Sequence, residues 1–169
     1  VAYVRTETFF AARAYTPGLR ALQTAIDRAP RPNTMPAIAA RGALHMRAAV
    51  IAGRAGNVAA ADLHLNDARS LGDKVPEDVY GGTAFGPDSV RIHEVSVAVS
   101  LGSEHVHRAI DVARAWAPPR ELPKERRSGF YIELARAQLW AGLTDDAFES
   151  LKVARRIAPQ HTREHPWAR

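Results

Sequence analysis

The chain has 169 residues, of which 46% are hydrophobic, so it can build a core and is not expected to be disordered. It contains no cysteine, which excludes disulfides, thiolate metal ligands and cysteine nucleophiles. The formal charge is +5, but acidic residues are interspersed with the basic ones, and this pattern favours a solvated helical surface over a nucleic-acid-binding patch.

Helical periodicity recurs along the chain, whereas alternating β-branched runs do not, so we predict an all-α fold. Proline stands near several expected helix starts, where its fixed φ fits and its missing N–H is not needed, as in Thr16-Pro17 and Leu122-Pro123. In chain order, the predicted helices cover residues 3–14, 17–29, 36–54, 58–71, 87–100, 104–116, 123–140 and 145–157, followed by a short tail from about 161.

Short links inside each pair of helices predict antiparallel hairpins, and longer links rich in Pro and Gly separate the pairs. The predicted hairpins cover about 3–29, 36–71, 87–116 and 123–157, with a tail at 161–169. The long link from Gly72 to Gly86 is interpreted either as a spacer or as a segment that folds over one end of a groove.

Three glycines, Gly56, Gly102 and Gly142, are predicted to join the two helices of a hairpin. Small residues recur at similar distances from each glycine, and they let paired helices approach closely. After Gly102 the pattern returns only if two residues are inserted, which places Ala109 and Ala113 in phase. This repetition predicts one domain over 1–169, a superhelix of hairpins like those of tetratricopeptide (TPR) repeats, rather than a generic helical bundle.

Three stretches resemble the C-terminal TPR-like region of actinobacterial helix-turn-helix transcriptional regulators of the XRE type. They are Gly42–Ala49, Thr83–Val90 running into His93 and Ser96–Gly102, and Tyr131–Ala137 running on to Arg156–Pro159 and His165-Pro166. The resemblance covers about residues 36–169, and Phe85-Gly86-Pro87 is its most specific part.

The resemblance implies a TPR-like region that binds a signal or mediates dimerisation, beside an N-terminal domain that binds DNA. Only about 30 residues precede the second hairpin, and we find no helix-turn-helix in them. We therefore expect DNA binding to belong to a segment outside this sequence. The alternative is a self-standing TPR adaptor that binds a peptide or a protein.

Catalytic and metal-binding motifs do not emerge from the sequence. His93-Glu94 lacks the second histidine of a zinc-protease motif, because position 97 is Val. His161 and His165 would share a helix face and suggest a Zn or Ni site, but a solvated tail is the preferred interpretation. We therefore predict no enzyme activity, no cofactor and no metal.

The first helix of each hairpin lines the concave face of a TPR array, and this placement predicts a ligand-binding groove. The candidate groove residues are Met46, Val50, Arg54, Phe85, Ile92, Ser96, Ile132, Arg136, Leu139 and Trp140. Arg54 and Arg136 would bind a carboxylate-bearing peptide or a small anion. The alternative is that both arginines pair with nearby acids, and that Trp140 serves packing.

The expected partner is a protein, a peptide or a small-molecule signal. A homodimer is also expected, because repeat arrays expose apolar ends, with Phe9-Phe10 and the C-terminal tail as candidate contacts. No apolar run is long enough for a bilayer, and residues 1–8 lack a signal-peptide core, so we predict a cytoplasmic protein without membrane contact.

Overall fold

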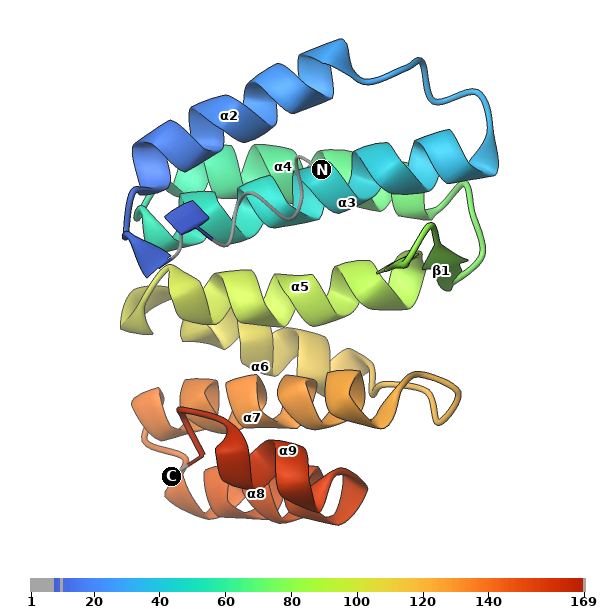
Figure 1. The fold of residues 1–169 in the computed structure, drawn as a ribbon. Helices are drawn as coiled ribbons and strands as arrows, with labels where there is room; N and C mark the ends of the chain where they lie inside the picture. Colours follow the sequence, from blue (N-terminus) through green and yellow to red (C-terminus); the bar gives the residue numbers. More distant parts are fainter. Residues whose placement is uncertain (1–7, 10, 169) are drawn as a thin grey trace. The chain divides into compact units, whose positions relative to one another are not determined.

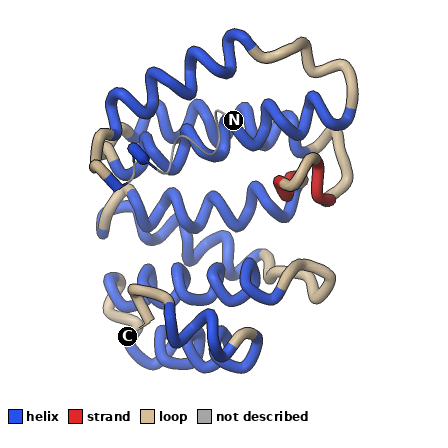
Figure 2. Tube along the Cα trace, in the orientation of Figure 1, coloured by secondary structure: helices blue, strands red, loops and turns tan. Residues whose placement is uncertain are grey.

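The structure is a computed structural model, and it describes residues 8–9 and 11–168. The chain divides into two compact units, residues 1–93 and residues 94–169. The fold is mostly helical, as Figure 2 shows, so the prediction of an all-α class is confirmed. Among the residues that the structure describes, no helix combines the length and apolar character that a bilayer crossing needs.

In its described part, the first unit contains three long helices, a small β-ribbon and the beginning of α5 (Figure 1). These elements are α2 (Tyr15–Arg28), α3 (Met35–Arg54), α4 (Val58–Gly72), β1 (Asp78–Tyr80), β2 (Thr83–Phe85) and the start of α5 (Pro87–Ser100). α3 packs against both α2 and α4. It is therefore the central helix of this unit.

Local chemistry explains where α3 and α4 begin and end. The Thr34 hydroxyl accepts from the backbone N–H of Ala37, and the Asn57 side chain accepts from that of Ala60. Between the helices, Gly56 takes a left-handed φ of 69°, and the N–H of Asn57 donates to the carbonyl of Ala52 at 2.9 Å. This is the Schellman arrangement, which ends a helix and reverses the chain within a few residues.

The core of the first unit is built on two faces of α3. One face packs against α2, with Leu22, Ile26, Ala48 and Ile51 buried together. The other face packs against α4 and the β-ribbon, and its buried residues are Ala39, Ala43, Met46, Ala68, Leu71, Val75, Phe85 and Val90. Small alanines on α3 let its neighbours approach closely, and larger side chains fill the space beside them.

The link after α4 forms a two-stranded antiparallel ribbon, which the sequence analysis did not predict. Val79 pairs with Ala84, and Tyr80 pairs with Thr83 at the turn. The ring of Phe85 lies directly over Gly42 of α3, where an added Cβ would come within 1.9 Å of it. The link is therefore part of the core of this unit and not a mere spacer.

The ribbon also sets the start of α5. The Glu77 carboxylate accepts from the backbone N–H of Ser89 at 2.8 Å and from the Ser89 hydroxyl. Glu77 can come this close because Gly86 has no side chain, since a Cβ there would lie 2.4 Å from the Glu77 Cα. A carboxylate at a helix N-terminus satisfies free N–H groups and favours the helix dipole.

The second unit contains the rest of α5, the 3₁₀ turn η1 (Ser103–His105), and four further helices in its described part. These helices are α6 (Val106–Ala115), α7 (Lys124–Trp140), α8 (Thr144–Ile157) and α9 (Pro159–Glu164). α7 packs extensively against α8, and both also contact α9. At the α7–α8 turn, Gly142 has a φ of 78°, and the N–H of Leu143 donates to the carbonyl of Gln138 at 2.8 Å.

The predicted helix bounds agree with the observed ones to within a residue or two from residue 15 onward. The 3₁₀ turn η1 lies between Gly102 and α6, and of the two alanines placed in phase after Gly102, Ala109 is fully buried and Ala113 is half-buried. Half of the predicted helix 3–14, and Phe10 of the proposed dimer contact, lie outside the described residues, and residues 12–14 are not helical, so the predicted end of that helix at 14 is wrong. One domain over 1–169 and a homodimer stay predictions.

Substituting Gly42 by Ala tests the packing of Phe85 on α3. Ala is normally the better helix former, but its Cβ would collide with the Phe85 ring, so we expect Gly42→Ala to lower the free energy of unfolding by about 1–3 kcal/mol. The matched control is Gly129→Ala in α7, whose Cβ would meet only His161 Cε1 at 3.9 Å. It should stabilise by about 0.5–1 kcal/mol. Equal urea midpoints for the two variants would contradict this packing.

Substituting Glu77 by Gln tests the cap on α5. Removing the charge weakens two hydrogen bonds to Ser89, so we expect a loss of roughly 1–2 kcal/mol in urea denaturation. Glu104→Gln, an exposed change in η1, should stay within about 0.5 kcal/mol of the parent. A Glu77→Gln chain as stable as that control would show that the carboxylate does not hold the helix start.

Candidate functional site

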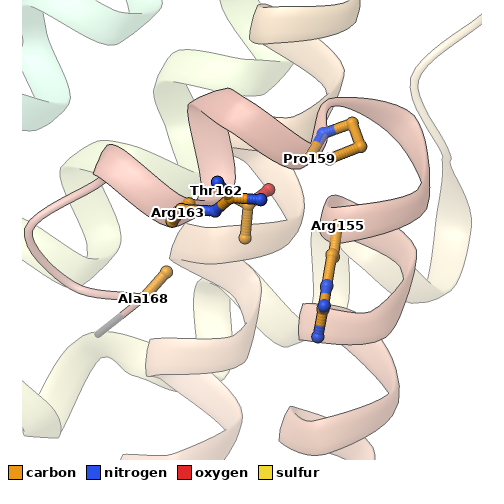
Figure 3. Close-up of a pocket in the computed structure, with 5 residues that line it drawn as sticks. All are labelled: Arg155, Pro159, Thr162, Arg163 and Ala168. Carbon is orange, nitrogen blue, oxygen red and sulfur yellow. The ribbon is translucent and has the colours of Figure 1, made fainter.

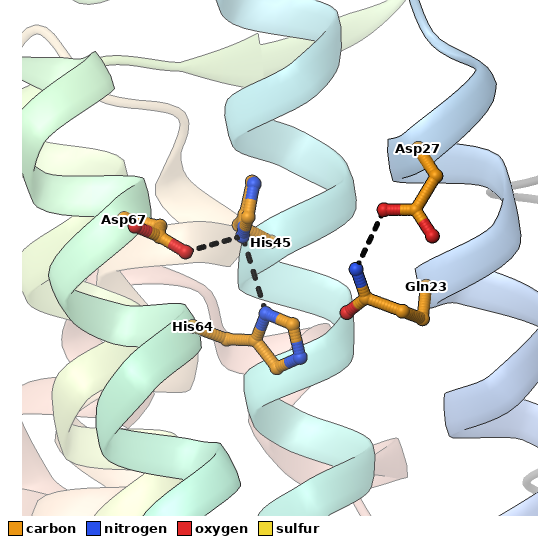
Figure 4. Close-up of polar contacts among 5 residues, drawn as sticks. All are labelled: Gln23, Asp27, His45, His64 and Asp67. Atoms are coloured by element: carbon orange, nitrogen blue, oxygen red, sulfur yellow. Dashed lines mark hydrogen bonds and ion pairs between the residues drawn. The ribbon is translucent and has the colours of Figure 1, made fainter.

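Two buried histidines face each other between α3 and α4, as Figure 4 shows. Their Nδ1 atoms are 3.2 Å apart, one from His45 on α3 and the other from His64 on α4. Asp67 lies one turn after His64, and its Oδ2 is 3.4 Å from the Nδ1 of His45. Both imidazoles are almost fully buried, whereas 49% of the Asp67 side chain is exposed.

Burial keeps both imidazoles neutral near pH 7. It lowers the pKa of His45 to about 4, against the opposing attraction of the Asp67 carboxylate. His64 and Arg41 lower the pKa of His45 a little further. Burial also lowers the pKa of His64, again opposed by Asp67. The pair therefore presents ring nitrogens with free lone pairs rather than two cations.

The sequence analysis did not single out this cluster. A histidine inside a helix gives no motif by itself, and the pairing depends on which faces of α3 and α4 meet. One signal was available, because His64 and Asp67 are three residues apart and so share a face of one helix. The partner on the facing helix is visible only when the hairpin is built.

In the second unit, one arginine lies over the rings of two tryptophans. The Arg136 guanidinium lies 4.0 Å from the ring centre of Trp167 and 5.2 Å from that of Trp140. It also pairs with Glu133 on the same helix at 2.7 Å. The alternative interpretation of Arg136, as a residue paired with a nearby acid, is therefore confirmed. We call Arg136, Trp140 and Trp167 the aromatic cluster.

The aromatic cluster is open to solvent. Trp140 is 45% exposed and Trp167 is 60% exposed, although both are large apolar groups. Further exposed apolar side chains occur nearby in sequence, namely Leu139 at the end of α7, Leu143 in the turn and Phe148 on α8. Single exposed apolar residues are common, but a concentration of them on one hairpin marks a candidate contact surface.

A cleft of about 330 Å³ lies beside the C-terminal tail (Figure 3). It is lined by Arg155 of α8, by Pro159, Thr162 and Arg163 of α9, and by Ala168. Ala168 follows Trp167 directly, so the cleft and the aromatic cluster share the same tail segment. Two guanidinium groups at one cleft provide donors for a carboxylate or another anion.

The candidate groove residues divide by their exposure. Met46, Val50, Phe85 and Ile132 are buried. Met46 and Phe85 belong to one core cluster, so in this structure they serve packing and present no surface to a ligand. Ile92 and Ser96 are half-buried on α5, and Arg54 is exposed at the end of α3. Leu139 and Trp140 are exposed at the end of α7, and Arg136, one turn before Trp140, is half-buried.

The histidines of the C-terminal tail do not share one helix. α9 ends at Glu164, and His165 has extended backbone angles just before Pro166. The two rings of His161 and His165 meet edge to face, and Nδ1 of His161 is 2.9 Å from the Ser128 hydroxyl. Ser128 also contacts the hydroxyl of Thr162, so this group ties α9 to α7.

Comparisons with protein-family models, with curated proteins and with solved structures found no match to this chain. Two groups of side chains have a geometry suited to binding: the histidine cluster of His45, His64 and Asp67, and the aromatic cluster.

Proposed function

We propose that this chain is a TPR-like helical repeat domain that binds a protein segment, and that it serves as the partner-sensing part of a transcriptional regulator. The first support is the likeness of two turns. Gly56 and Gly142 have the same left-handed conformation and the same pair of backbone hydrogen bonds around them. Each turn joins two helices that pack extensively along each other.

The second support is the matching of positions around these turns. Gly142 follows Gly56 by 86 residues, and the same interval relates Ala61 to Ala147 and Ala68 to Ala154. All four alanines are buried where the paired helices meet. The interval also relates His64 to Ser150, a buried polar residue that donates to Gln138 across its hairpin at 2.7 Å. Such equivalence is expected of repeated units.

The observation that carries a binding function is the aromatic cluster. Trp and Arg are the residue types that contribute most at protein interfaces, and here they are arranged before any partner arrives. The stack on Arg136 holds both rings in place, so less side-chain freedom is lost when they are covered. Burying the two exposed rings would give a partner a substantial apolar contact.

Charge favours an acidic partner over a second copy of this chain. The formal net charge is +5, so two copies repel each other. The cleft that includes Ala168, the residue after Trp167, is lined by Arg155 and Arg163. We therefore propose that the occupant is a peptide segment with an aromatic or large aliphatic side chain and one or more nearby carboxylates. The apolar side chain would cover Trp140 and Trp167, and a carboxylate would enter the cleft.

The regulator role rests on the resemblance of residues 36–169 to XRE-type regulators, and the adaptor remains the second candidate. Both use the same binding surface. Reading the coding sequence upstream of Val1 separates them. A helix-turn-helix domain there supports the regulator, whereas its absence supports the adaptor.

Selection of displayed random peptides on the immobilised chain tests the binding surface. We expect enrichment of peptides that combine a large apolar residue with Asp or Glu. Trp167→Ala should weaken the binding of a synthesised winning peptide at least about 10-fold, because tryptophan is enriched among the interface residues whose truncation costs about 2 kcal/mol or more. Replacing Arg155 and Arg163 by Ala should remove the preference for acidic residues and lower the salt dependence of binding.

The matched control is Leu63→Ala on α4, which removes a side chain that is 59% exposed in the first unit. It should leave peptide affinity unchanged. No enrichment, or winning peptides that bind the Trp167→Ala chain as tightly as the parent, would contradict the proposal. A dimer in sedimentation that Trp140→Ala dissociates would also contradict it, since the surface would then bind a second copy.

A further inference from the structure

We propose that His45, His64 and Asp67 form a binding site for one divalent transition-metal ion, with Zn²⁺ as the best fit. The site lies between α3 and α4, and it is independent of the protein-binding surface proposed above. One ring nitrogen of each histidine and a carboxylate oxygen of Asp67 all lie within 4.8 Å of one another. No other such group occurs in the part of the chain that the structure describes.

The distances match the edges of a metal tetrahedron. Zinc lies about 2.0–2.1 Å from imidazole nitrogen and about 2.0–2.2 Å from carboxylate oxygen, so neighbouring ligands in a tetrahedral site are about 3.3–3.5 Å apart. The two Nδ1 atoms are 3.2 Å apart, and Asp67 Oδ2 is 3.4 Å from His45 Nδ1. Asp67 is half exposed, so its side chain can turn to complete the third edge.

Hydrogen bonding alone accounts poorly for the same geometry. His45 Nδ1 carries at most one proton, yet it faces both His64 Nδ1 and the Asp67 carboxylate. If His45 donates that proton to both groups, both contacts are longer than the usual hydrogen-bond distance of about 2.9–3.0 Å. If His64 donates instead, the carboxylate faces a lone pair on His45. A cation at the centre satisfies all three atoms at once.

The protonation state is the one that a metal requires. Zinc binds neutral imidazole and ionised carboxylate, and burial already lowers the pKa of both histidines. Little work is therefore needed to free the nitrogens at neutral pH. Arg41 opposes a cation here, since its charge acts on His45, but the Asp67 carboxylate acts in the other direction and more strongly.

The ligand set also indicates which metal and which role. Two imidazoles and one carboxylate suit Zn²⁺ and its neighbours better than Ca²⁺ or Mg²⁺, which prefer oxygen ligands. The exposed edge of Asp67 provides an entry path and leaves a fourth position for water or another ligand. Because the ligands come from both helices, a bound ion would clamp α3 to α4.

The second hairpin supplies an internal comparison. At the position equivalent to His64 it has Ser150, whose hydroxyl is satisfied by the Gln138 side chain. Ser150 and Gln138 therefore close the α7–α8 interface with a neutral hydrogen bond. Two facing histidines at the first hairpin are a different solution, and a bound metal explains why both are imidazoles.

Titration calorimetry with ZnSO₄ on the tag-free, chelator-treated chain tests the site. We expect one Zn²⁺ per chain and a rise in the thermal midpoint when Zn²⁺ is added. Co²⁺ bound in place of Zn²⁺ should give visible absorption bands with the intensity typical of tetrahedral coordination. His64→Gln should abolish this absorption. Asp67→Asn should weaken Zn²⁺ binding at least about 10-fold, because even residues that only hydrogen-bond to a metal ligand contribute that much to affinity.

His165→Gln is the matched control, because it removes a histidine from the other close pair, and it should bind Zn²⁺ like the parent. Asp67→Asn changes a half-exposed side chain, so we expect this variant to fold. It therefore still tests the site if the His64→Gln variant does not fold. Absence of stoichiometric binding by the parent chain would overturn the proposal. Binding that survives in Asp67→Asn and is lost in His165→Gln would overturn it as well. Neither result bears on peptide binding, which uses α7, α8 and the tail.

Discussion

The close approach of paired helices at alanine is the constraint on which both units depend. In each of the hairpins α3–α4 and α7–α8, a left-handed glycine reverses the chain, and an alanine five residues later lies buried against the first helix. The first turn of the second helix then has no room for a larger side chain. This contact sets how near the helices lie, and so which residues further along can touch.

Close packing between two helices restricts which polar side chains can be buried there. Any polar side chain between the helices must find its partner on the facing helix, because water does not reach it. Ser150 meets this demand with Gln138, and His64 meets it with His45. The second pair leaves Asp67 within reach of the same nitrogen. The metal site that we propose is thus a consequence of the packing geometry of one hairpin.

The same rigidity serves the binding function that we propose. α7 is held by α8 and α9, and its last turn presents Trp140 while the returning tail presents Trp167. A surface that is ordered in advance loses little freedom on binding. Arg136 contributes by contacting the rings and pairing with Glu133, which is the second of the two interpretations that the sequence left open.

Helix bounds could be predicted because their signals are local. Pro at helix starts, Asn57 as a cap and glycines at turns each act within a few residues, and the observed bounds follow them. The β-ribbon was missed because its strands are only three residues long and owe their place to Phe85 packing over Gly42. The histidine cluster and the contact of Trp167 with Arg136 depend on residues far apart in sequence, which periodicity does not bring together.

Enlarging the buried alanines tests the packing constraint most directly. In urea denaturation, Ala61→Leu and Ala147→Leu should each lower the free energy of unfolding by about 1–3 kcal/mol, because neither interface has space for the added atoms. Ala59→Leu, on the exposed side of α4, should change it by less than about 0.5 kcal/mol. If leucine at 61 and 147 is tolerated as well as leucine at 59, then close approach at alanine does not hold these hairpins together.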